Sequence, residues 1–420
     1  MIPGAAASGA AAKAACEAAG RPVGRPFASG PVGALQADSS LLLLCTVLCT
    51  GRGGGVERFA FVLHPLHFVD YTRQYPALKV LPEAFVEKAF RHLPPYRASH
   101  ITGVRSPTGV EAEGWFVILP ISARLMLEMP FRSKLLPRIV DAGRLAERLG
   151  ARIVGLGAFT KVVGDHGVSV NKALSIPVTT GNSYTAASAV DGALLAAERM
   201  GMVPAECEAS VVGATGAIGR AVAAALAGSV RRLSLIGRRV DKLQAIQRSL
   251  LDLGTGTDVS VGTDARAAAR TADVVLTVSS ATGVLLEPED LRPGSVVCDV
   301  ARPRNVSERV YESRRDVLVI DGGVIAVPGQ VDFHYDFGFP PGYAEACIAE
   351  TMILALERRY EPYTLGLDIR PERVREIREM ARRNGFSVAG FRRFDRPIPD
   401  GEIEAIRDEA ARSRRRSGTA

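Results

Sequence analysis

Short apolar runs rich in Val, Ile and Leu recur through the second half of the chain, separated by turns and helix-forming stretches. One run, at 209–212, is followed by a glycine-containing turn and then by an Ala-rich helical stretch at 220–228. The runs are short and end in Gly, Ser or Pro, as buried strands of a parallel sheet do. They predict an α/β fold with a Rossmann-type doubly wound parallel sheet, whose further strands lie within 231–239, 259–264, 272–281, 295–303 and 316–323.

Residues 56–200 have an alternation of their own and predict a smaller N-terminal α/β domain. Apolar residues at helical spacing start at 133 and stop at Gly150. Residues 176–201 are typical of a strand, a polar turn and a long helix that leads into the next domain. Three further strands are expected within 58–65, 114–122 and 151–160.

The C-terminal part returns to helical patterns at 344–360 and 371–385. The second of these is amphipathic and ends at Gly385. Before them, residues 327–343 are rich in aromatic residues, Gly and Pro, which predicts a long irregular loop. Ordered loops of this length usually line a site.

Both ends of the chain differ in composition from the rest. Residues 1–55 are dominated by Ala, Gly, Ser and Pro and predict a disordered leader. Its apolar stretch at 41–49 is too short to cross a bilayer, which needs about 20 residues. We interpret the leader as translated sequence ahead of a folded protein that begins near Val56. The Arg-rich end, 411–420, predicts a frayed tail.

The net charge of +7 says little about partners, because residues 1–55 and 408–420 each carry four basic and two acidic side chains. Neither nucleic acid nor a membrane is indicated. The six cysteines include no C-x-x-C pair, so neither a zinc site nor a disulfide framework is expected. This cysteine usage predicts a reducing, cytoplasmic compartment.

The turn after the run at 209–212 has the glycine spacing of a dinucleotide-binding site. Gly213 would form the tight turn, Gly216 would let the backbone approach the phosphates, and Gly219 would let helix and strand pack closely. The N–H groups at the start of the helix would face the pyrophosphate. The predicted cofactor-binding residues of this region are Gly213, Ala214, Thr215, Gly216, Ala217, Ile218, Gly219 and Ser279.

The end of the next strand indicates which nucleotide binds. Sites that prefer NAD usually place an acidic residue there, whereas this chain has Arg238 and Arg239. Two guanidinium groups suit a 2′-phosphate, so we expect NADPH. A solvated basic turn is the alternative.

The expected organisation follows from these patterns. We expect the substrate in the crevice between the two α/β domains, beside the nicotinamide. The predicted segments are a disordered leader at 1–55, a substrate domain at 56–200, an NADP(H)-binding Rossmann domain at 201–330, a site-lining loop and C-terminal helices at 331–410, and a disordered tail at 411–420.

Cys347 is a candidate nucleophile, because it lies near the start of a predicted helix, where the dipole favours a thiolate. Its small flanking residues leave the sulfur accessible, while Glu345 and Glu350 would raise its pKa. From position alone, a buried structural cysteine stays open as the alternative. Cys298 lies inside a strand-like run and is expected to pack within the sheet.

From about residue 56 to 410 the chain resembles the acyl-[acyl-carrier-protein] reductases that form fatty aldehydes. The shared stretches are LGAFT (156–160), TTGNSYTA (179–186), VVGATGAIG (211–219), DGG (321–323) and ACIAE (346–350). The cysteine of the last stretch is the acyl-accepting nucleophile of that family, which implies this role for Cys347. The nucleotide half also resembles shikimate dehydrogenases and glutamyl-tRNA reductases, although the latter need an N-terminal nucleophilic cysteine and residues 56–200 contain none.

The resemblance implies NADPH-dependent reduction of a fatty acyl thioester, with an acyl carrier protein or acyl-CoA as the acyl donor. An oxyanion hole is then required. Backbone N–H groups at the start of the 344–360 helix are candidates, as are the hydroxyls of Thr180, Ser183 and Thr185, which equally suit a helix-capping turn. His166 and His334 are candidate proton donors.

Two other functions stay open. A shikimate-type dehydrogenase would use a Lys–Asp pair, which Lys161 and Asp191 could supply. A non-catalytic NADP(H)-binding redox sensor would need Cys347 only as an oxidisable thiol.

Overall fold

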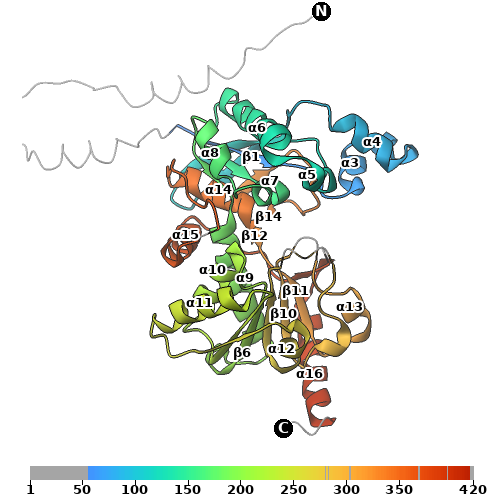
Figure 1. The fold of residues 1–420 in the computed structure, drawn as a ribbon, viewed down its shortest axis with the longest axis vertical. Coiled ribbons are helices and arrows are strands. Elements are labelled where there is room, and N and C mark those ends of the chain that lie inside the picture. The colour runs from blue at the N-terminus through green and yellow to red at the C-terminus, as the bar shows by residue number, and fades with distance from the viewer. Residues whose placement is uncertain are drawn as a thin grey trace, which may run out of the picture. The chain divides into compact units, whose positions relative to one another are not determined.

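A computed structural model describes residues 55–416 except positions 280, 282, 302, 303, 368 and 395. The predicted leader therefore lies outside the described residues, apart from its last position. Two six-stranded sheets organise the described part of the chain (Figure 1).

The sheet of the nucleotide-binding half is entirely parallel, with the order β11-β10-β9-β6-β7-β8. This is the doubly wound order that the apolar runs predicted, and it confirms the Rossmann-type fold. Three neighbouring strands, β9, β10 and β11, are buried along their whole length, which explains why they are rich in Val, Ile and Leu. The strands are β6 (Glu208–Val212), β7 (Arg232–Ile236), β8 (Asp258–Gly262), β9 (Val274–Thr277), β10 (Val296–Asp299) and β11 (Leu318–Asp321), with helices α10 (Ala217–Leu226), α11 (Val240–Leu251), α12 (Ala265–Thr271) and α13 (Arg309–Ser313).

The N-terminal sheet is mixed, with the order β13-β2-β3-β1-β4-β5. Strand β1 is parallel to β3 and β4, whereas β2 is antiparallel to β3. The amphipathic pattern from 133 forms a short helical turn, Phe131–Leu135, and then helix α6. The elements are β1 (Glu57–Leu63), α3 (Phe68–Gln74), α4 (Glu83–Phe90), β2 (Tyr96–Arg105), β3 (Glu111–Ile118), α5 (Ala123–Glu128), α6 (Leu136–Arg148), β4 (Val154–Leu156), α7 (Ala158–Val162), α8 (Val168–Ala173) and β5 (Val178–Thr179).

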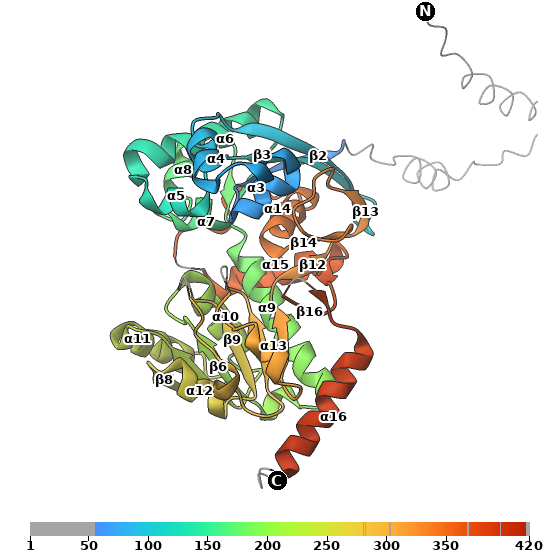
Figure 2. The same cartoon turned by 90° about the vertical axis from the view of Figure 1, so that its right-hand side faces the viewer.

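Parts of the C-terminal segment pack back onto the N-terminal sheet. Strand β13 (Gly329–Asp332) lies within the predicted irregular loop and pairs with β2, beside which it lies in Figure 2. Helix α14 (Ala346–Leu356) contacts β1, β3 and β4. The connecting helix α9 (Asn182–Arg199) contacts α10, α14 and α15 (Pro371–Arg383). Strands β12 (Val324–Ala326) and β14 (Tyr343–Glu345) precede α14 and form a three-stranded sheet with β15 (Ser387–Val388), which follows it.

The end of the chain is more ordered than the sequence indicated. Helix α16 (Asp400–Arg416) continues through most of the predicted disordered tail. Arg412 and Arg416 both pair with Glu409 along this helix. A short hairpin of β16 (Arg392–Arg393) and β17 (Arg396–Pro397) precedes it.

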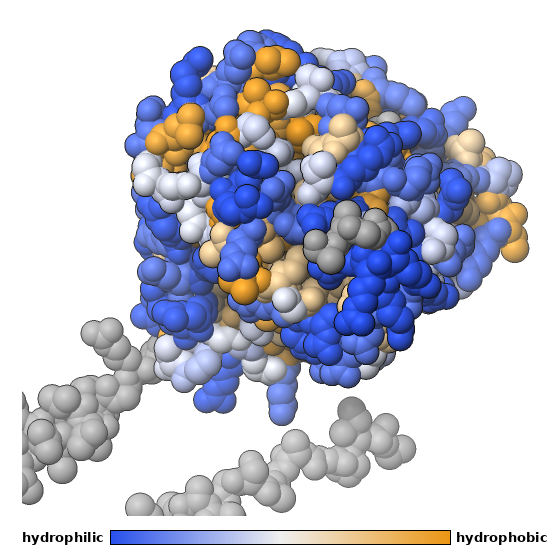
Figure 3. Space-filling model, turned by 90° about the horizontal axis from the view of Figure 1, so that it is seen from below, coloured by the Kyte–Doolittle hydropathy of each residue, from blue (hydrophilic) through white to orange (hydrophobic). Residues whose placement is uncertain are grey.

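The face seen from below in Figure 3 is mostly hydrophilic, with its hydrophobic residues in separate groups. No helix within the described residues is both long enough and apolar enough to cross a membrane.

Candidate active site

The glycine-rich turn after β6 makes close contacts that only glycine permits. Gly213 has a φ of 94°, and a Cβ there would lie 2.8 Å from the Cα of Ser279. At Gly219 a Cβ would lie 2.2 Å from the carbonyl oxygen of Gly213. The turn lies where β6 and β9 are neighbours and the strand order reverses. α/β sheets bind their ligands at this switch point.

A cavity of about 690 Å³, the nucleotide cavity, opens at this turn. Gly216 caps helix α10 without a side-chain capping bond, so the first N–H groups of the helix are available to an anion. The volume of this cavity and the N–H donors at the start of α10 suit a dinucleotide. Ala214 and Gly219 are buried behind the turn. The predicted cofactor residues that line the cavity are Gly213, Thr215, Gly216, Ala217, Ile218, Arg238 and Ser279.

The two arginines after β7 have different surroundings. Arg238 lines the nucleotide cavity. Arg239 instead makes a two-bonded ion pair with Asp241, at 3.1 and 2.9 Å, on the first turn of α11. Of these two arginines, Arg238 is the one among the described residues that line the nucleotide cavity.

Cys347 lies at the second position of α14, against the start of α9. Gly181, the N-cap residue of α9, has a φ of 72°, and a Cβ there would lie 2.3 Å from both Cα and Cβ of Cys347. Only glycine allows this approach. The TTGNSYTA and ACIAE stretches are thus in direct contact.

Cys347 lines a second cavity of about 340 Å³, the cysteine cavity. Residues of the N-terminal half, such as Phe159, and of the nucleotide-binding half, such as Val300, both line it. The cysteine cavity shares part of its wall with the nucleotide cavity, formed by Lys161, Val162, Ile218, Val278 and Ser279.

The surroundings of Cys347 keep its thiol protonated. Burial raises the pKa of the thiol to about 12; the ammonium of Lys161 lowers it, while the carboxylates of Glu345 and Glu350 raise it. The favourable effect of the helix N-terminus is therefore outweighed. The thiol donates a hydrogen bond to Oε2 of Glu345, at 3.5 Å.

Glu350, three residues further along α14, is fully buried and joins the two stretches. Its carboxylate accepts hydrogen bonds from the hydroxyls of Thr179 and Thr364 and from the backbone N–H of Tyr184. Burial raises the pKa of this carboxyl group, and the hydrogen bonds from Thr179, Tyr184 and Thr364 oppose the rise. The network holds α14 against β5 and α9.

The three predicted hydroxyl donors are engaged elsewhere. Thr180 donates to the carbonyl oxygen of Thr364 at 3.0 Å, and the Ser183 hydroxyl lies 2.7 Å from that of Thr364. Thr185 lines the cysteine cavity, but its hydroxyl donates to the carbonyl oxygen of Gly181 at 2.8 Å. These hydroxyls complete the buried network and the start of α9 instead of pointing a free donor at the thiol.

The backbone at the start of α14 offers donors instead. The N–H of Ala346 is bonded to the carbonyl oxygen of Gly323 at 2.8 Å. The next two N–H groups, of Cys347 and Ile348, lie in the first turn, where a helix supplies no acceptor, and the cap residue Glu345 makes no side-chain capping bond. These two N–H groups therefore have no acceptor within the helix.

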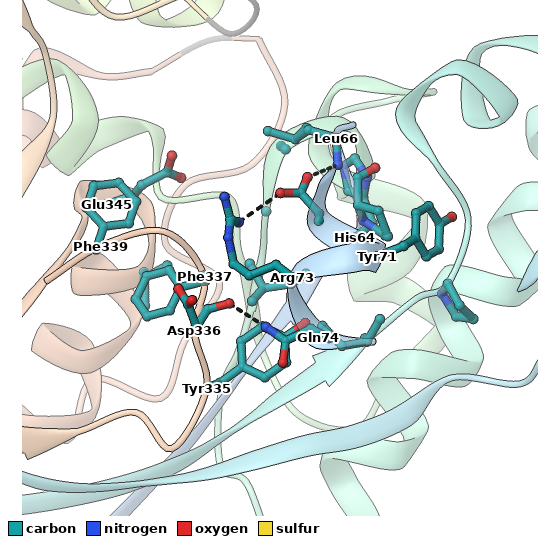
Figure 4. A pocket seen from close by; sticks show the side chains of 18 of the residues that line it. His64, Leu66, Tyr71, Arg73, Gln74, Tyr335, Asp336, Phe337, Phe339 and Glu345 are labelled. Atoms are coloured by element: carbon teal, nitrogen blue, oxygen red, sulfur yellow. Dashed lines mark hydrogen bonds and ion pairs between the residues drawn. The ribbon is translucent and has the colours of Figure 1, made fainter. Parts of the chain in front are cut away.

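A third cavity of about 120 Å³, the aromatic cavity, adjoins the cysteine cavity (Figure 4). Leu66, Ala158 and Glu345 line both. In Figure 4, side chains of the segment after β13 lie on one side and His64 and Tyr71 lie on the other. Tyr335, Asp336, Phe337 and Phe339, from the aromatic segment at 327–343, are among the residues that line this cavity.

The other candidate polar residues are dispersed. Lys161 lines the nucleotide and cysteine cavities and donates to the carbonyl oxygen of Thr180 at 3.1 Å. Asp191 pairs with Arg378 on α15, nine residues into α9, about 13 Å along the helix from its start. A Lys161–Asp191 pair is therefore not formed.

His166, one of the two candidate proton donors, lines the nucleotide cavity, and burial lowers its pKa. His334 pairs with Asp332, and its ring bonds to the carbonyl oxygen of His100. The two histidines therefore lie in different surroundings.

Sequence reasoning missed two residues of the site. Asn182 is 4% exposed and lines the nucleotide cavity, and its Oδ1 has no hydrogen-bond partner among the described residues. Its place inside TTGNSYTA was an available signal. Thr364 lies in a stretch without regular structure, and no local pattern marks it.

Comparison with known proteins agrees with the nucleotide-binding half. Residues 195–321 match the family model of shikimate / quinate 5-dehydrogenases. The aminotransferase PigE of Serratia sp. is 30% identical over 297 residues, which are 68% of this chain and 33% of PigE. The chain thus spans about a third of that relative. The long-chain acyl-[acyl-carrier-protein] reductase of Synechococcus elongatus is 27% identical over 308 residues, 70% of this chain and 87% of that protein.

Solved structures give more distant similarities. The quinate dehydrogenase of Corynebacterium glutamicum in complex with NAD aligns over 77% of this chain and 98% of its own, with 13% identity and a TM-score of 0.35. The 5-ketofructose reductase of Gluconobacter sp. aligns over 78% and 99%, with 14% identity and a TM-score of 0.34. The family match places a nucleotide-binding domain similar to that of shikimate / quinate 5-dehydrogenases within residues 195–321.

Proposed function

We propose that this protein reduces an acyl thioester to an aldehyde with NADPH, through an acyl group held on Cys347. The observation that carries the proposal is that the cysteine cavity adjoins both of the other cavities. The cysteine cavity shares walls with the nucleotide cavity and also with the aromatic cavity. A hydride donor and an apolar acyl group could therefore both reach the thiol. The similarity to the Synechococcus reductase supports the same reaction.

The nucleotide cavity has residues suited to each part of the cofactor. The N–H groups at the start of α10 would hold the pyrophosphate, and Arg238 would contact the 2′-phosphate. Asn182 would offer its unpartnered Oδ1 to an N–H of the ligand. When bound, NADPH supplies a hydride to the carbonyl carbon of the acyl group.

Acyl transfer to Cys347 is the step that the residues of this chain perform. The sulfur attacks the thioester carbonyl of the donor and displaces the carrier thiol, an exchange of one thioester for another that needs no ATP. Backbone N–H groups of Cys347 and Ile348 would stabilise the oxyanion. The aromatic cavity would receive the first part of the acyl chain. The donor would be an acyl carrier protein or acyl-CoA.

The dehydrogenase alternative has one observation in its favour. Lys161 lies on the wall between the nucleotide and cysteine cavities, where it could hold a proton for an alcohol or ketone substrate. Its expected partner Asp191 is paired with Arg378 instead. Such a reaction would leave Cys347 without a role, so it stays the second candidate.

Turnover distinguishes the two. The protein is incubated with palmitoyl-CoA or palmitoyl carrier protein and NADPH, and the fatty aldehyde is measured by gas chromatography. We expect aldehyde from the unmodified chain and none from Cys347→Ala, with NADPH binding retained. Oxidation of an alcohol substrate by Cys347→Ala at the unmodified rate would favour the dehydrogenase.

A further inference from the structure

The thiol of Cys347 needs a group that takes its proton before or during attack. Its side chain is 5% exposed, and burial holds the pKa of the thiol near 12, so little thiolate exists at neutral pH. Three charged side chains act on the sulfur from the elements packed around it: Lys161 on α7, Glu345 at the end of β14 and Glu350 on α14.

Only one of these three can accept the proton. Lys161 is a cation that already donates to the carbonyl oxygen of Thr180, so it has no acceptor to offer. Both oxygens of Glu350 are occupied by three donors, and it has no hydrogen bond to the sulfur among those found for the described residues. Glu345 places Oε2 3.5 Å from Sγ of Cys347.

The backbone fixes Glu345 in this position. It is the last residue of β14, where it pairs with Val324 of β12, and it is also the N-cap residue of α14. Its side chain lines both the cysteine cavity and the aromatic cavity, so it lies beside the path of the acyl group. It is only partly buried, which lets it exchange protons with solvent.

We propose that Glu345 is the general base and acid of acyl transfer to Cys347, an inference that rests on the proposed function. As the sulfur attacks the thioester carbonyl, its proton passes to the Glu345 carboxylate. When the tetrahedral intermediate collapses, the bond to the carrier sulfur breaks, and Glu345 returns the proton to that leaving sulfur. One thioester and one thiol are consumed and one of each is formed, so no net proton is taken up.

The reductive half consumes one proton. Once the acyl carbon has gained a hydride, the hemithioacetal oxygen re-forms its carbonyl and the carbon–sulfur bond breaks with its electron pair on Cys347. That thiolate takes a proton through Glu345, which is replenished from solvent. The products are the aldehyde and the free thiol.

A purely electrostatic role for Glu345 predicts that Glu345→Gln changes the reaction rates of Cys347 in the opposite direction. If its carboxylate only opposed the thiolate by charge, Glu345→Gln would increase the thiolate fraction and speed every reaction of Cys347. If Glu345 is the base, Glu345→Gln removes it and slows those reactions. General-base catalysis is typically worth about 10²- to 10⁴-fold in rate.

The test measures two pre-steady-state rates at pH 7, acylation by palmitoyl-CoA and alkylation of Cys347 by iodoacetamide, each followed by intact mass. We expect Glu345→Gln to slow both, acylation by about 100-fold or more. Glu345→Asp, which keeps a carboxylate, is expected to react faster than Glu345→Gln. Glu312→Gln, an exposed change on α13 outside all three cavities, is the matched control. The affinity for NADPH should be the same in all four proteins.

Unchanged or faster rates in Glu345→Gln would overturn the inference, as would a Glu345→Asp variant no faster than Glu345→Gln. If the unmodified chain forms no acyl adduct, the proposed function fails, and the alkylation rates still decide whether Glu345 acts as a base for the thiol. The two failures are therefore distinguishable.

Discussion

Replacing Arg238 by Ala tests how the nucleotide is selected. Arg238 lines the nucleotide cavity, whereas Arg239 is held by Asp241 in a two-bonded ion pair. One guanidinium group, not two, is therefore available to a 2′-phosphate. We expect Arg238→Ala to weaken NADPH binding and to leave NADH binding unchanged.

The expected loss of NADPH binding free energy follows from removing one charged hydrogen-bonding group. Hydrogen bonds to charged groups contribute about 1.5–3 kcal/mol. Arg238 is exposed, so solvent screening places the expected loss near the lower value, about 1.5 kcal/mol. This corresponds to roughly a tenfold rise in the Kd for NADPH. Arg239→Ala, the neighbouring control, should change it by less than about twofold, since exposed ion pairs contribute little.

The assay is titration of the protein with NADPH and with NADH, followed by nucleotide fluorescence, for the unmodified chain and the two variants. Equal affinity for the two nucleotides in the unmodified chain would refute selection by the 2′-phosphate. A larger effect from Arg239→Ala than from Arg238→Ala would refute the assignment to Arg238.

Three further predictions use four substitutions. Cys347→Ser should fold and bind NADPH but form no aldehyde, because a serine hydroxyl is almost never ionised at neutral pH. Cys298→Ser, a change inside β10, should keep most of the activity. If gas chromatography gave the reverse result, the nucleophile would be misassigned. Gly181→Ala should displace Cys347 and lower the melting temperature by several degrees, since its Cβ would lie 2.3 Å from that residue; an unchanged acylation rate would contradict this. Burial lowers the pKa of His64 to about 4, so the unfolded chain binds a proton at higher pH than the folded chain does. The free energy of unfolding should therefore fall by about 3 kcal/mol as the pH drops from 7 to 4. In urea titrations His64→Gln should lose this pH dependence, and the same pH profile in both proteins would argue against the assignment.

The sheet of the nucleotide-binding half could be predicted because each strand is a complete local signal. Strands such as β9 and β10 are buried along their whole length, so each appears as an unbroken apolar run. The glycine turn was equally local. Strand β2 was missed, because only three of its ten residues are buried and polar residues interrupt its apolar ones. Strand β13 was missed because its partner is β2, more than 200 residues away.

The site was less predictable, because its electrostatics depend on contacts that are distant in sequence. Helix position alone favoured a thiolate at Cys347, but Gly181 packs against that residue and buries it. The hydroxyls of Thr180 and Ser183 were candidates for substrate contact, yet both bond to Thr364 in the network around Glu350. A buried carboxyl group needs such partners, and no local pattern shows where they come from.

Covalent capture of the acyl group tests the central claim most directly. The protein is mixed with palmitoyl-CoA or palmitoyl carrier protein in the absence of nucleotide, and the intact mass and peptide masses are measured before and after NADPH is added. We expect one palmitoyl group on Cys347, absent from Cys347→Ala, and its release as aldehyde once NADPH is present. Finding no adduct on the unmodified chain, or an adduct on another residue that NADPH releases as aldehyde, would contradict it.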